Sequence, residues 1–411
     1  MSARKRTMTC IVGCVASLAM AAGAVAADWP QWRGPNGEAK VSDFNAPQTW
    51  PKELKQQWNE TVGTGDATPA LVGDKLYVFT RQGADEVLRC MDVKTGKTLW
   101  EDKHAPGVSV SGAPGQHPGP RSSPAVGDGK VVTIGVSGIL SCLDAESGKL
   151  LWRQDPYKSW PKFYTASSPI IVDDMCVAEL GGDVDGAIMG LDVATGNPKW
   201  KTAIDGATYS TPVVATIGGQ KQIVAYTAKK LMGLSLDDGK VLWEIPEVPQ
   251  RMTYNAVTPV IEGDVIFVTG QGKGAYAIQV EKQENGFKPK ELWTNPDANS
   301  GFSTPVLKDG LLYALTSKAS FFCLDAKTGK TLWTSPPRPR ERGFGSLVDA
   351  GQVILALTPS AELIVIKPND KEFTQLASIK VSDAQPYAYP VVSGNKVIIK
   401  GQDAVTLFTI E

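Results

Sequence analysis

A short string that could bind phosphate occurs twice in the chain. Residues 94–100 read Lys-Thr-Gly-Lys-Thr-Leu-Trp, and the same string returns at 327–333. Gly-Lys-Thr ends a phosphate-binding loop, but that loop needs another glycine five places earlier and must open a helix. Met91 and Leu324 occupy that place, and strand-favouring residues follow the string. The string therefore does not predict a nucleotide site.

Other residues suited to chemistry are few. His104 and His117 both fall in the Gly- and Pro-rich stretch 102–121, with no spacing typical of a nucleophile triad or a zinc site. The nearest acidic cluster, 182–186, reads as an exposed hairpin turn. We expect solvated histidines on a mobile loop and no metal site.

The repeated string belongs to a longer pattern. Cys90–Trp100 recurs as Cys142–Trp152, Gly190–Trp200, Gly233–Trp243 and Cys323–Trp333. Each copy ends on a tryptophan after a turn glycine, and Ala277–Trp293 is a variant with an insertion. The residues concerned are Gly96, Gly148, Gly196, Gly239 and Gly329, and Trp100, Trp152, Trp200, Trp243, Trp293 and Trp333.

A second marker, Ser or Thr followed by Pro, precedes each copy. It occurs at Pro69, Pro124, Pro169, Pro212, Pro259 and Pro305, with Ser346-Leu347 and Tyr389-Pro390 completing the series. Eight units spaced by 42 to 55 residues result. Within each unit except the last, turn residues separate four short apolar runs, which predicts four strands. Thin four-stranded units at this period predict an all-β, eight-bladed β-propeller of antiparallel blades.

The glycine and the tryptophan of each unit have predicted structural roles. The glycine supplies the positive φ of the turn between the third and fourth strands. The tryptophan, central in the outer strand, is expected to pack into the seam with the next blade.

The pattern Ala-x-Asp-x-x-Thr-Gly-x-x-x-Trp resembles the tryptophan-docking motif of the pyrroloquinoline quinone (PQQ)-like repeat propellers. That family includes quinoprotein alcohol dehydrogenases and a non-enzymatic lipoprotein of the outer-membrane β-barrel assembly machinery. The resemblance covers about residues 58–411, with Cys or Gly where the family most often has Ala. It implies eight blades. The seventh unit departs from the motif, with Leu376 where the tryptophan is expected.

The last unit, 389–411, lacks a fourth strand, whereas Lys55–Asn59 forms a strand around Trp58 without a blade. We therefore expect this strand to close the ring and remove two exposed sheet edges. The predicted domains are a signal peptide at 1–26, an extension at 27–54 and the propeller at 55–411. The two tryptophans of Asp28–Asn36 favour docking of the extension on the ring.

The first residues resemble a secretory signal. Arg4-Lys5-Arg6 precede an apolar stretch, and Ala24-Val25-Ala26 offers a cleavage site. The predicted location is periplasmic or extracellular. Cys14 leaves lipid anchoring as an alternative. The formal charge of −1 becomes −4 once the three basic residues are removed, which does not indicate a nucleic-acid partner.

Four cysteines remain after this signal. Cys90, Cys142 and Cys323 occupy the same place in different units, too far apart for a disulfide, and Cys176 is the fourth. Buried free thiols are predicted.

The resemblance also raises an enzymatic alternative, a small PQQ-dependent oxidoreductase with calcium. The larger quinoprotein dehydrogenases place the quinone against a disulfide between adjacent cysteines and use a metal beside an acidic base. This chain has no Cys-Cys pair and no convincing acidic cluster. We therefore predict neither cofactor nor catalytic residue.

The position three residues before each marker's second residue should lie near one mouth of the central channel. It holds Asp66, Arg121, Ala166, Tyr209, Ala256, Phe302, Phe344 and Tyr387, with Tyr164 and Tyr254 two places earlier in their own units. Converging aromatic side chains suggest a binding rim, and packing beneath the loops is the alternative. The Pro-rich stretch 335–345 adds Arg338, Arg340 and Arg342, which could grip an acidic ligand or pair locally.

Together these observations predict an exported, non-catalytic propeller that binds other cell-envelope proteins or peptides, as a monomeric ring.

Overall fold

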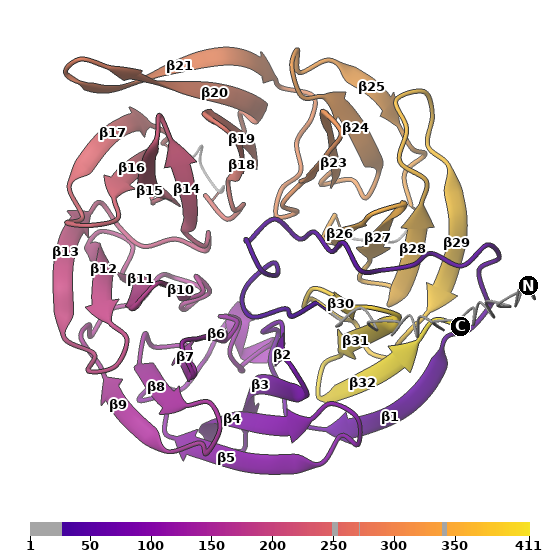
Figure 1. Cartoon of the computed structure of the whole chain (residues 1–411), viewed down its shortest axis with the longest axis horizontal. Coiled ribbons are helices and arrows are strands. Elements are labelled where there is room, and N and C mark those ends of the chain that lie inside the picture. The colour runs from indigo at the N-terminus through magenta and orange to yellow at the C-terminus, as the bar shows by residue number, and fades with distance from the viewer. Residues whose placement is uncertain (1–26, 249–253, 271, 339–342) are drawn as a thin grey trace, which may run out of the picture.

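The computed structural model describes residues 27–248, 254–270, 272–338 and 343–411. Arg340, Arg342, Cys14 and the predicted signal peptide at 1–26 lie outside these ranges. Eight four-stranded antiparallel sheets are arranged in a ring around a central axis (Figure 1). The prediction of an eight-bladed all-β propeller is confirmed.

Each blade runs from an inner strand at the axis to an outer strand at the rim. Blades one to four contain β2 (Ala70–Val72), β3 (Lys75–Gln82), β4 (Asp85–Asp92) and β5 (Thr98–His104); β6 (Ala125–Gly127), β7 (Lys130–Ile134), β8 (Leu140–Asp144) and β9 (Leu150–Gln154); β10 (Ile170–Val172), β11 (Met175–Gly181), β12 (Gly186–Asp192) and β13 (Pro198–Ile204); β14 (Val213–Ile217), β15 (Gln220–Tyr226), β16 (Lys230–Ser235) and β17 (Val241–Pro246).

The remaining blades follow the same order. They contain β18 (Val260–Glu262), β19 (Val265–Gly270), β20 (Gly274–Gln283) and β21 (Gly286–Asn295); β22 (Val306–Lys308), β23 (Leu311–Leu315), β24 (Phe321–Asp325) and β25 (Thr331–Thr334); β26 (Ser346–Ala350), β27 (Val353–Leu357), β28 (Glu362–Ile366) and β29 (Gln375–Lys380); β30 (Val391–Ser393), β31 (Lys396–Lys400), β32 (Ala404–Thr409) and β1 (Lys55–Thr61). A single short 3-10 helix, η1 (Ala113–Gln116), is found in the described residues.

The ring is closed by strands from the two ends of the propeller. Strand β1 pairs antiparallel with β32, and Trp58 lies opposite Leu407. The eighth blade therefore takes its outer strand from before the first blade and its other three strands from the end of the chain.

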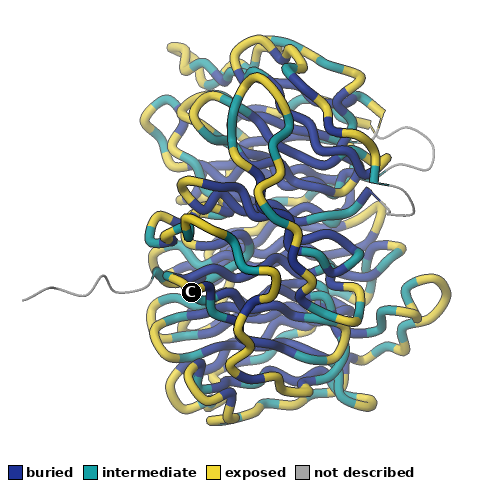
Figure 2. Tube along the Cα trace, turned by 90° about the vertical axis from the view of Figure 1, so that its right-hand side faces the viewer, coloured by how far each residue is buried: buried dark blue, intermediate teal, exposed yellow. Residues whose placement is uncertain are grey.

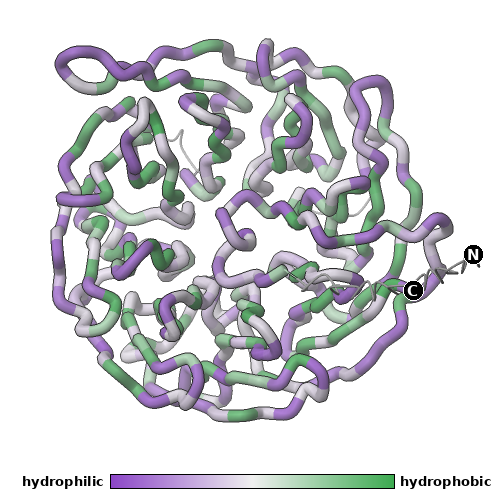
Figure 3. Tube along the Cα trace, in the orientation of Figure 1, coloured by the Kyte–Doolittle hydropathy of each residue, from purple (hydrophilic) through white to green (hydrophobic). Residues whose placement is uncertain are grey.

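The core lies between neighbouring blades. The two middle strands of each blade are almost wholly buried, whereas outer strands alternate buried and exposed residues, and exposed residues concentrate at the turns (Figure 2). The long hairpin of β20 and β21, which holds the insertion of the fifth unit, projects from the rim with a hydrophilic tip (Figure 3).

Most tryptophans of the repeat join one blade to the next. The Nε1–H of Trp58, Trp152 and Trp200 donates to a backbone carbonyl of the following blade, at 2.9 Å in each case. The indole ring also packs against the turn glycine of the following blade. At the seam between Trp293 and Gly329, for example, a Cβ added to the glycine would come within 2.3 Å of the ring. The seam is therefore a stacked Trp-Gly contact reinforced by one hydrogen bond.

Three seams differ from this pattern. Trp100 Nε1 has no hydrogen-bond partner among the described residues, and Trp243 donates to Gln222 Oε1 of its own blade. In the seventh blade, the strand register shows that Ala377 holds the tryptophan position, while Leu376 is 43% exposed. The assignment of that position to Leu376 was wrong by one residue, because the bulge in the strand pairing was not placed from sequence.

The four cysteines that follow residue 26 are free and buried, as predicted. Burial raises the pKa of the Cys90, Cys142 and Cys323 thiols to about 12. These thiols are therefore protonated at neutral pH and unreactive.

The segment before β1 docks on the ring. It crosses the axis in the view of Figure 1 and pairs with inner strands on both sides, through bridges of Trp29 with Leu71 and of Lys40 with Asp349. Trp29 and Arg33 are fully buried. This segment, residues 27–54, is called the plug below.

Candidate functional site

The plug closes one end of an aromatic cavity on the axis. The cavity has a volume of about 530 Å³ and opens where the inner strands begin. It is lined by all eight residues of the predicted rim series: Asp66, Arg121, Ala166, Tyr209, Ala256, Phe302, Phe344 and Tyr387. We call this cavity the funnel. Its position follows from the repeat, since equivalent positions in eight blades must converge on the axis.

One wall of the funnel is a cluster of three rings. Phe163, Tyr209 and Tyr254 contact one another with ring centroids 5.2 to 6.0 Å apart. The Phe163 N–H donates to the Tyr209 hydroxyl oxygen at 3.2 Å. Burial raises the pKa of Tyr209, so its hydroxyl stays protonated. This wall is apolar with a polar edge, which suits contacts with side chains and backbone alike.

The opposite wall is a second aromatic series. Phe302 and Phe344 lie 5.2 Å apart, Phe344 and Tyr387 6.1 Å apart, and Tyr387 meets the edge of His117 at 5.0 Å. Phe302 is 42% exposed. Because Phe302 contacts Phe344, it belongs to a contiguous apolar surface, and exposed surfaces of this kind are a feature of binding sites.

The floor is formed by the plug. Trp32 packs edge-on against Tyr389 at 4.9 Å, and its Nε1–H donates to Thr258 Oγ1 at 3.1 Å. Behind it, the buried Arg33 donates to the carbonyls of Pro305 at 2.8 Å and Glu38 at 3.1 Å. Burial lowers the pKa of Arg33. These contacts hold the floor against the ring.

Charged groups gather at one side of the funnel. His117 Nδ1 lies 3.3 Å from Asp66 Oδ2, and Arg121 donates through Nη2 to the His117 carbonyl at 2.9 Å. The Arg121 Nη1 is buried without a hydrogen-bond partner among the described residues. Burial lowers the pKa of Arg121, and Asp66 opposes that effect. Arg121 is thus the one arginine among the described residues that line the funnel.

A buried lysine supports this corner from behind. Lys400 donates to the carbonyls of Gly65, Gly401 and Gln402 at 2.7 to 3.1 Å. Burial lowers its pKa to about 8. The lysine fixes the backbone next to Asp66.

Two predicted rim residues lie elsewhere. Tyr164 adopts φ +66° and turns under the loop before blade two, where its hydroxyl accepts from the Ser111 N–H at 3.2 Å. Arg338 is half-buried and paired with Glu362. Arg338, the one arginine of the stretch 335–345 within the described residues, thus forms a local ion pair.

Other funnel residues were not predicted. Phe163, Trp32 and Tyr389 line the cavity, but they fall outside the repeated position. His117 was predicted to be solvated and instead lines the funnel. The His104 side chain is 7% exposed beside Glu86, with its ring stacked on Phe79. The expectation of a solvated loop was wrong for His104, which is the last residue of strand β5. The His117 side chain is 31% exposed but lies in the wall of the funnel, because the stretch after β5 reaches the mouth of the ring.

The donor set can be compared with that of a quinone and metal site. Asp66 is the one carboxylate among the described residues that line the funnel. No group of three or more His, Cys, Asp or Glu suited to a metal occurs in the described part of the chain. A hard cation such as Ca²⁺ takes about 6–8 oxygen ligands, several of them carboxylates. The funnel residues do not fit a metal-assisted quinone.

The fold and the axial funnel define the class of this protein, a PQQ-like repeat propeller with tryptophan-docked blades. Residues 84–335 match the family described as outer membrane protein assembly factor BamB, and the chain belongs to that family.

Individual proteins show the same relationship. The chain is 25% identical over 370 residues to outer membrane protein assembly factor BamB of Burkholderia pseudomallei (strain K96243), covering 85% of this chain and 86% of that protein. The crystal structure of BamB from Moraxella catarrhalis superposes with a TM-score of 0.65 at 14% identity, over 87% of this chain and 97% of that one. Quinohemoprotein alcohol dehydrogenase from Comamonas testosteroni superposes with a TM-score of 0.64 at 15% identity, over 93% and 80%. The structural matches share the fold.

Within the described part of the chain, no helix is long and apolar enough to cross a membrane.

Proposed function

We propose that this protein is a non-catalytic binding propeller of the bacterial cell envelope, and that the funnel holds segments of other envelope proteins. The observation that carries the proposal is the shape and lining of a cavity of about 530 Å³. The six aromatic side chains of its two walls converge there with one guanidinium that has an unpartnered N–H among the described residues. Cavities of this size with few polar groups are suited to ligand binding.

The chemistry of the funnel suggests the class of ligand. Two aromatic walls accept apolar or aromatic side chains, and Arg121 can donate to a backbone carbonyl or a carboxylate. A polypeptide segment supplies both. The related proteins named as outer-membrane assembly factors support an envelope location, and the signal-like start of the chain supports export.

A redox role is not proposed, because the funnel lacks the carboxylates that a metal-assisted quinone needs. Titrating the protein with PQQ and calcium tests this point. We expect no quinone absorbance band and no dye-linked oxidation of alcohols. Turnover that a chelator abolishes would establish the enzymatic alternative.

The binding role can be tested by quantitative capture of proteins from an envelope extract. The double substitution Phe302→Ala with Phe344→Ala removes the exposed wall of the funnel. The control, Leu99→Ala with Leu151→Ala, removes side chains that are 51% and 40% exposed on outer strands. We expect the funnel variant to lose about tenfold or more of the captured partners and the control to lose none. Equal capture by both variants would refute the proposal.

A further inference from the structure

The inner strands carry eight equivalent backbone positions that face the axis. Each is the second residue of its inner strand, or the fourth in β26. All lie two residues after the second residue of the repeated Ser/Thr-Pro marker: Leu71, Val126, Ile171, Val214, Ile261, Leu307, Asp349 and Val392. In an antiparallel ladder, alternate residues direct both N–H and C=O away from the neighbouring strand. These eight positions are therefore oriented to pair with a chain that enters the axis.

The plug uses three of these positions. Leu71 exchanges two hydrogen bonds with Trp29, at 2.7 and 2.8 Å. The Val126 N–H donates to the Pro30 carbonyl at 2.8 Å. Asp349 donates to the Ala39 carbonyl at 2.8 Å and accepts from the Val41 N–H at 2.9 Å. The axis-facing backbone groups of the inner strands can thus hold an extended chain by hydrogen bonds.

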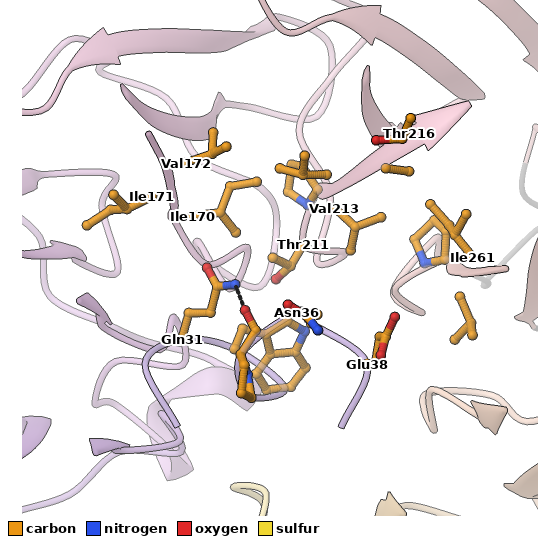
Figure 4. Close-up of a pocket in the computed structure, with 18 of the residues that line it drawn as sticks. Gln31, Asn36, Glu38, Ile170, Ile171, Val172, Thr211, Val213, Thr216 and Ile261 are labelled. Carbon is orange, nitrogen blue, oxygen red and sulfur yellow. Dashed lines mark hydrogen bonds between the residues drawn. The ribbon is translucent and has the colours of Figure 1, made fainter. Parts of the chain in front are cut away.

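Three further positions line an open chamber. Ile171, Val214 and Ile261 belong to β10, β14 and β18, which the plug leaves uncovered in Figure 1. They border a cavity of about 450 Å³ near the other ends of the inner strands, on the opposite side of Trp32 from the funnel. Ile170, Ile171 and Val213 are among its lining residues (Figure 4). Among the described residues, no other segment forms a backbone hydrogen bond with these three positions. We call this cavity the edge chamber.

The charge of the edge chamber is set by the plug. Glu38 contributes the one charged side chain among its described lining residues. Its carboxylate is exposed, and no salt bridge to it forms within the described part of the chain. Gln31 and Asn36 supply the neighbouring polar groups (Figure 4).

We propose that the edge chamber binds an extended, positively charged segment of another polypeptide by strand addition. The segment pairs its backbone with Ile171, Val214 and Ile261, as the plug pairs with Leu71 and Asp349, and places a lysine or arginine beside Glu38. Main-chain hydrogen bonds supply affinity in this mode of recognition, and side-chain pockets supply specificity. The site is separate from the funnel and does not depend on the function proposed for it.

The test uses the full mature chain and the synthetic peptide Lys-Val-Thr-Val-Thr-Val-Lys. Calorimetry measures its affinity, and amide hydrogen exchange reports where it binds. We expect exchange at Ile171, Val214 and Ile261 to slow on binding, while Leu307, an equivalent position outside the chamber, exchanges as before. N-methylation of alternate peptide amides should weaken binding at least tenfold.

Two protein variants test whether the peptide occupies the edge chamber and no other surface. Glu38→Gln should weaken the peptide several-fold, whereas Glu60→Gln, an exposed carboxylate on β1, should not. The funnel variant with Phe302→Ala and Phe344→Ala should bind the peptide normally. Absence of binding, equal affinity for the N-methylated peptide, or slowed exchange confined to the funnel would overturn the proposal. Concentration-dependent self-association that protects the same amides without peptide would assign these edges to a second copy of the chain and would also overturn it.

Discussion

At the level of single residues, the seams between blades depend on glycines that no other residue can replace without strain. Gly329 has φ +71°, and a Cβ there would approach the Trp293 ring to 2.3 Å. Gly310 has nearly the same φ, +76°, but nothing lies within 4 Å of its Cβ position. The two glycines therefore separate the cost of backbone conformation from the cost of a steric clash.

We predict that Gly310→Ala lowers the free energy of unfolding by about 1–2 kcal/mol, the cost of a left-handed residue. Gly329→Ala should add a clash of about 1–3 kcal/mol to that cost. Urea denaturation of the two variants measures the difference. Equal losses would show that the tryptophan stack moves aside freely.

A buried carboxyl predicts how stability varies with pH. Glu179 is fully buried; its Oε1 accepts from the Thr208 N–H at 2.7 Å, while Oε2 and both oxygens of Asp205 have no partner among the described residues. Burial raises the pKa of Glu179 to about 8. Between its ordinary value near 4.5 and about 8, the folded protein holds a proton that the unfolded chain has released.

Glu179 therefore makes the free energy of unfolding fall as pH rises through this window. We predict that Glu179→Gln, which cannot ionise, flattens the fall and is more stable than the parent at pH above about 8, by a few kcal/mol at most. Thermal denaturation at a series of pH values measures this effect. The exposed Glu284→Gln serves as control, and identical pH profiles for all three proteins would contradict the assignment.

At the level of elements, the closing strand β1 joins the two ends of the ring. Trp58 is 9% exposed and donates to the Val93 carbonyl at 2.9 Å. We predict that Trp58→Ala lowers the free energy of unfolding by about 3–5 kcal/mol, while Leu99→Ala on β5 changes it by less than about 0.5 kcal/mol. A melting temperature of Trp58→Ala equal to that of the parent would show that closure does not depend on this strand.

The repeat explains which elements could be predicted. Eight strands that start at equivalent positions must point equivalent residues at the axis, so Phe302 and Tyr387 were placed together from spacing alone. Phe163 was missed because its neighbour Tyr164 adopts φ +66°. With this backbone conformation, the Phe163 side chain lines the funnel in place of the Tyr164 side chain. Leu376 was misplaced because a β-bulge shifts the register by one residue.

The plug and the histidines mark the limit of prediction from the repeat. Trp32 forms the funnel floor through contacts with Thr258 and Tyr389, which are distant in sequence and are not marked by a repeat. His117 reaches Asp66 only because the stretch before blade two folds inward. Local pattern determines strands and turns, whereas the docking of irregular segments depends on tertiary contacts.

At the level of the complete ring, the plug divides the axis into two chambers of different character. The funnel is aromatic and carries Arg121, whereas the edge chamber exposes strand edges and carries Glu38. The two proposed binding roles therefore call for two chain segments of different chemistry, one for each chamber. This arrangement is consistent with a binding role and requires no catalytic group.

If the funnel binds other polypeptides in the cell, a photoreactive group at its mouth should form crosslinks to them. Site-specific photo-crosslinking from a phenylalanine analogue in place of Phe302, in the organism that makes the protein, measures this contact. The matched position is Leu99, which is 51% exposed on the outer strand β5. We expect crosslinks to cell-envelope proteins from position 302 and none above background from position 99. No crosslink at position 302, or the same products from both positions, would show that the funnel is not a binding site for polypeptides.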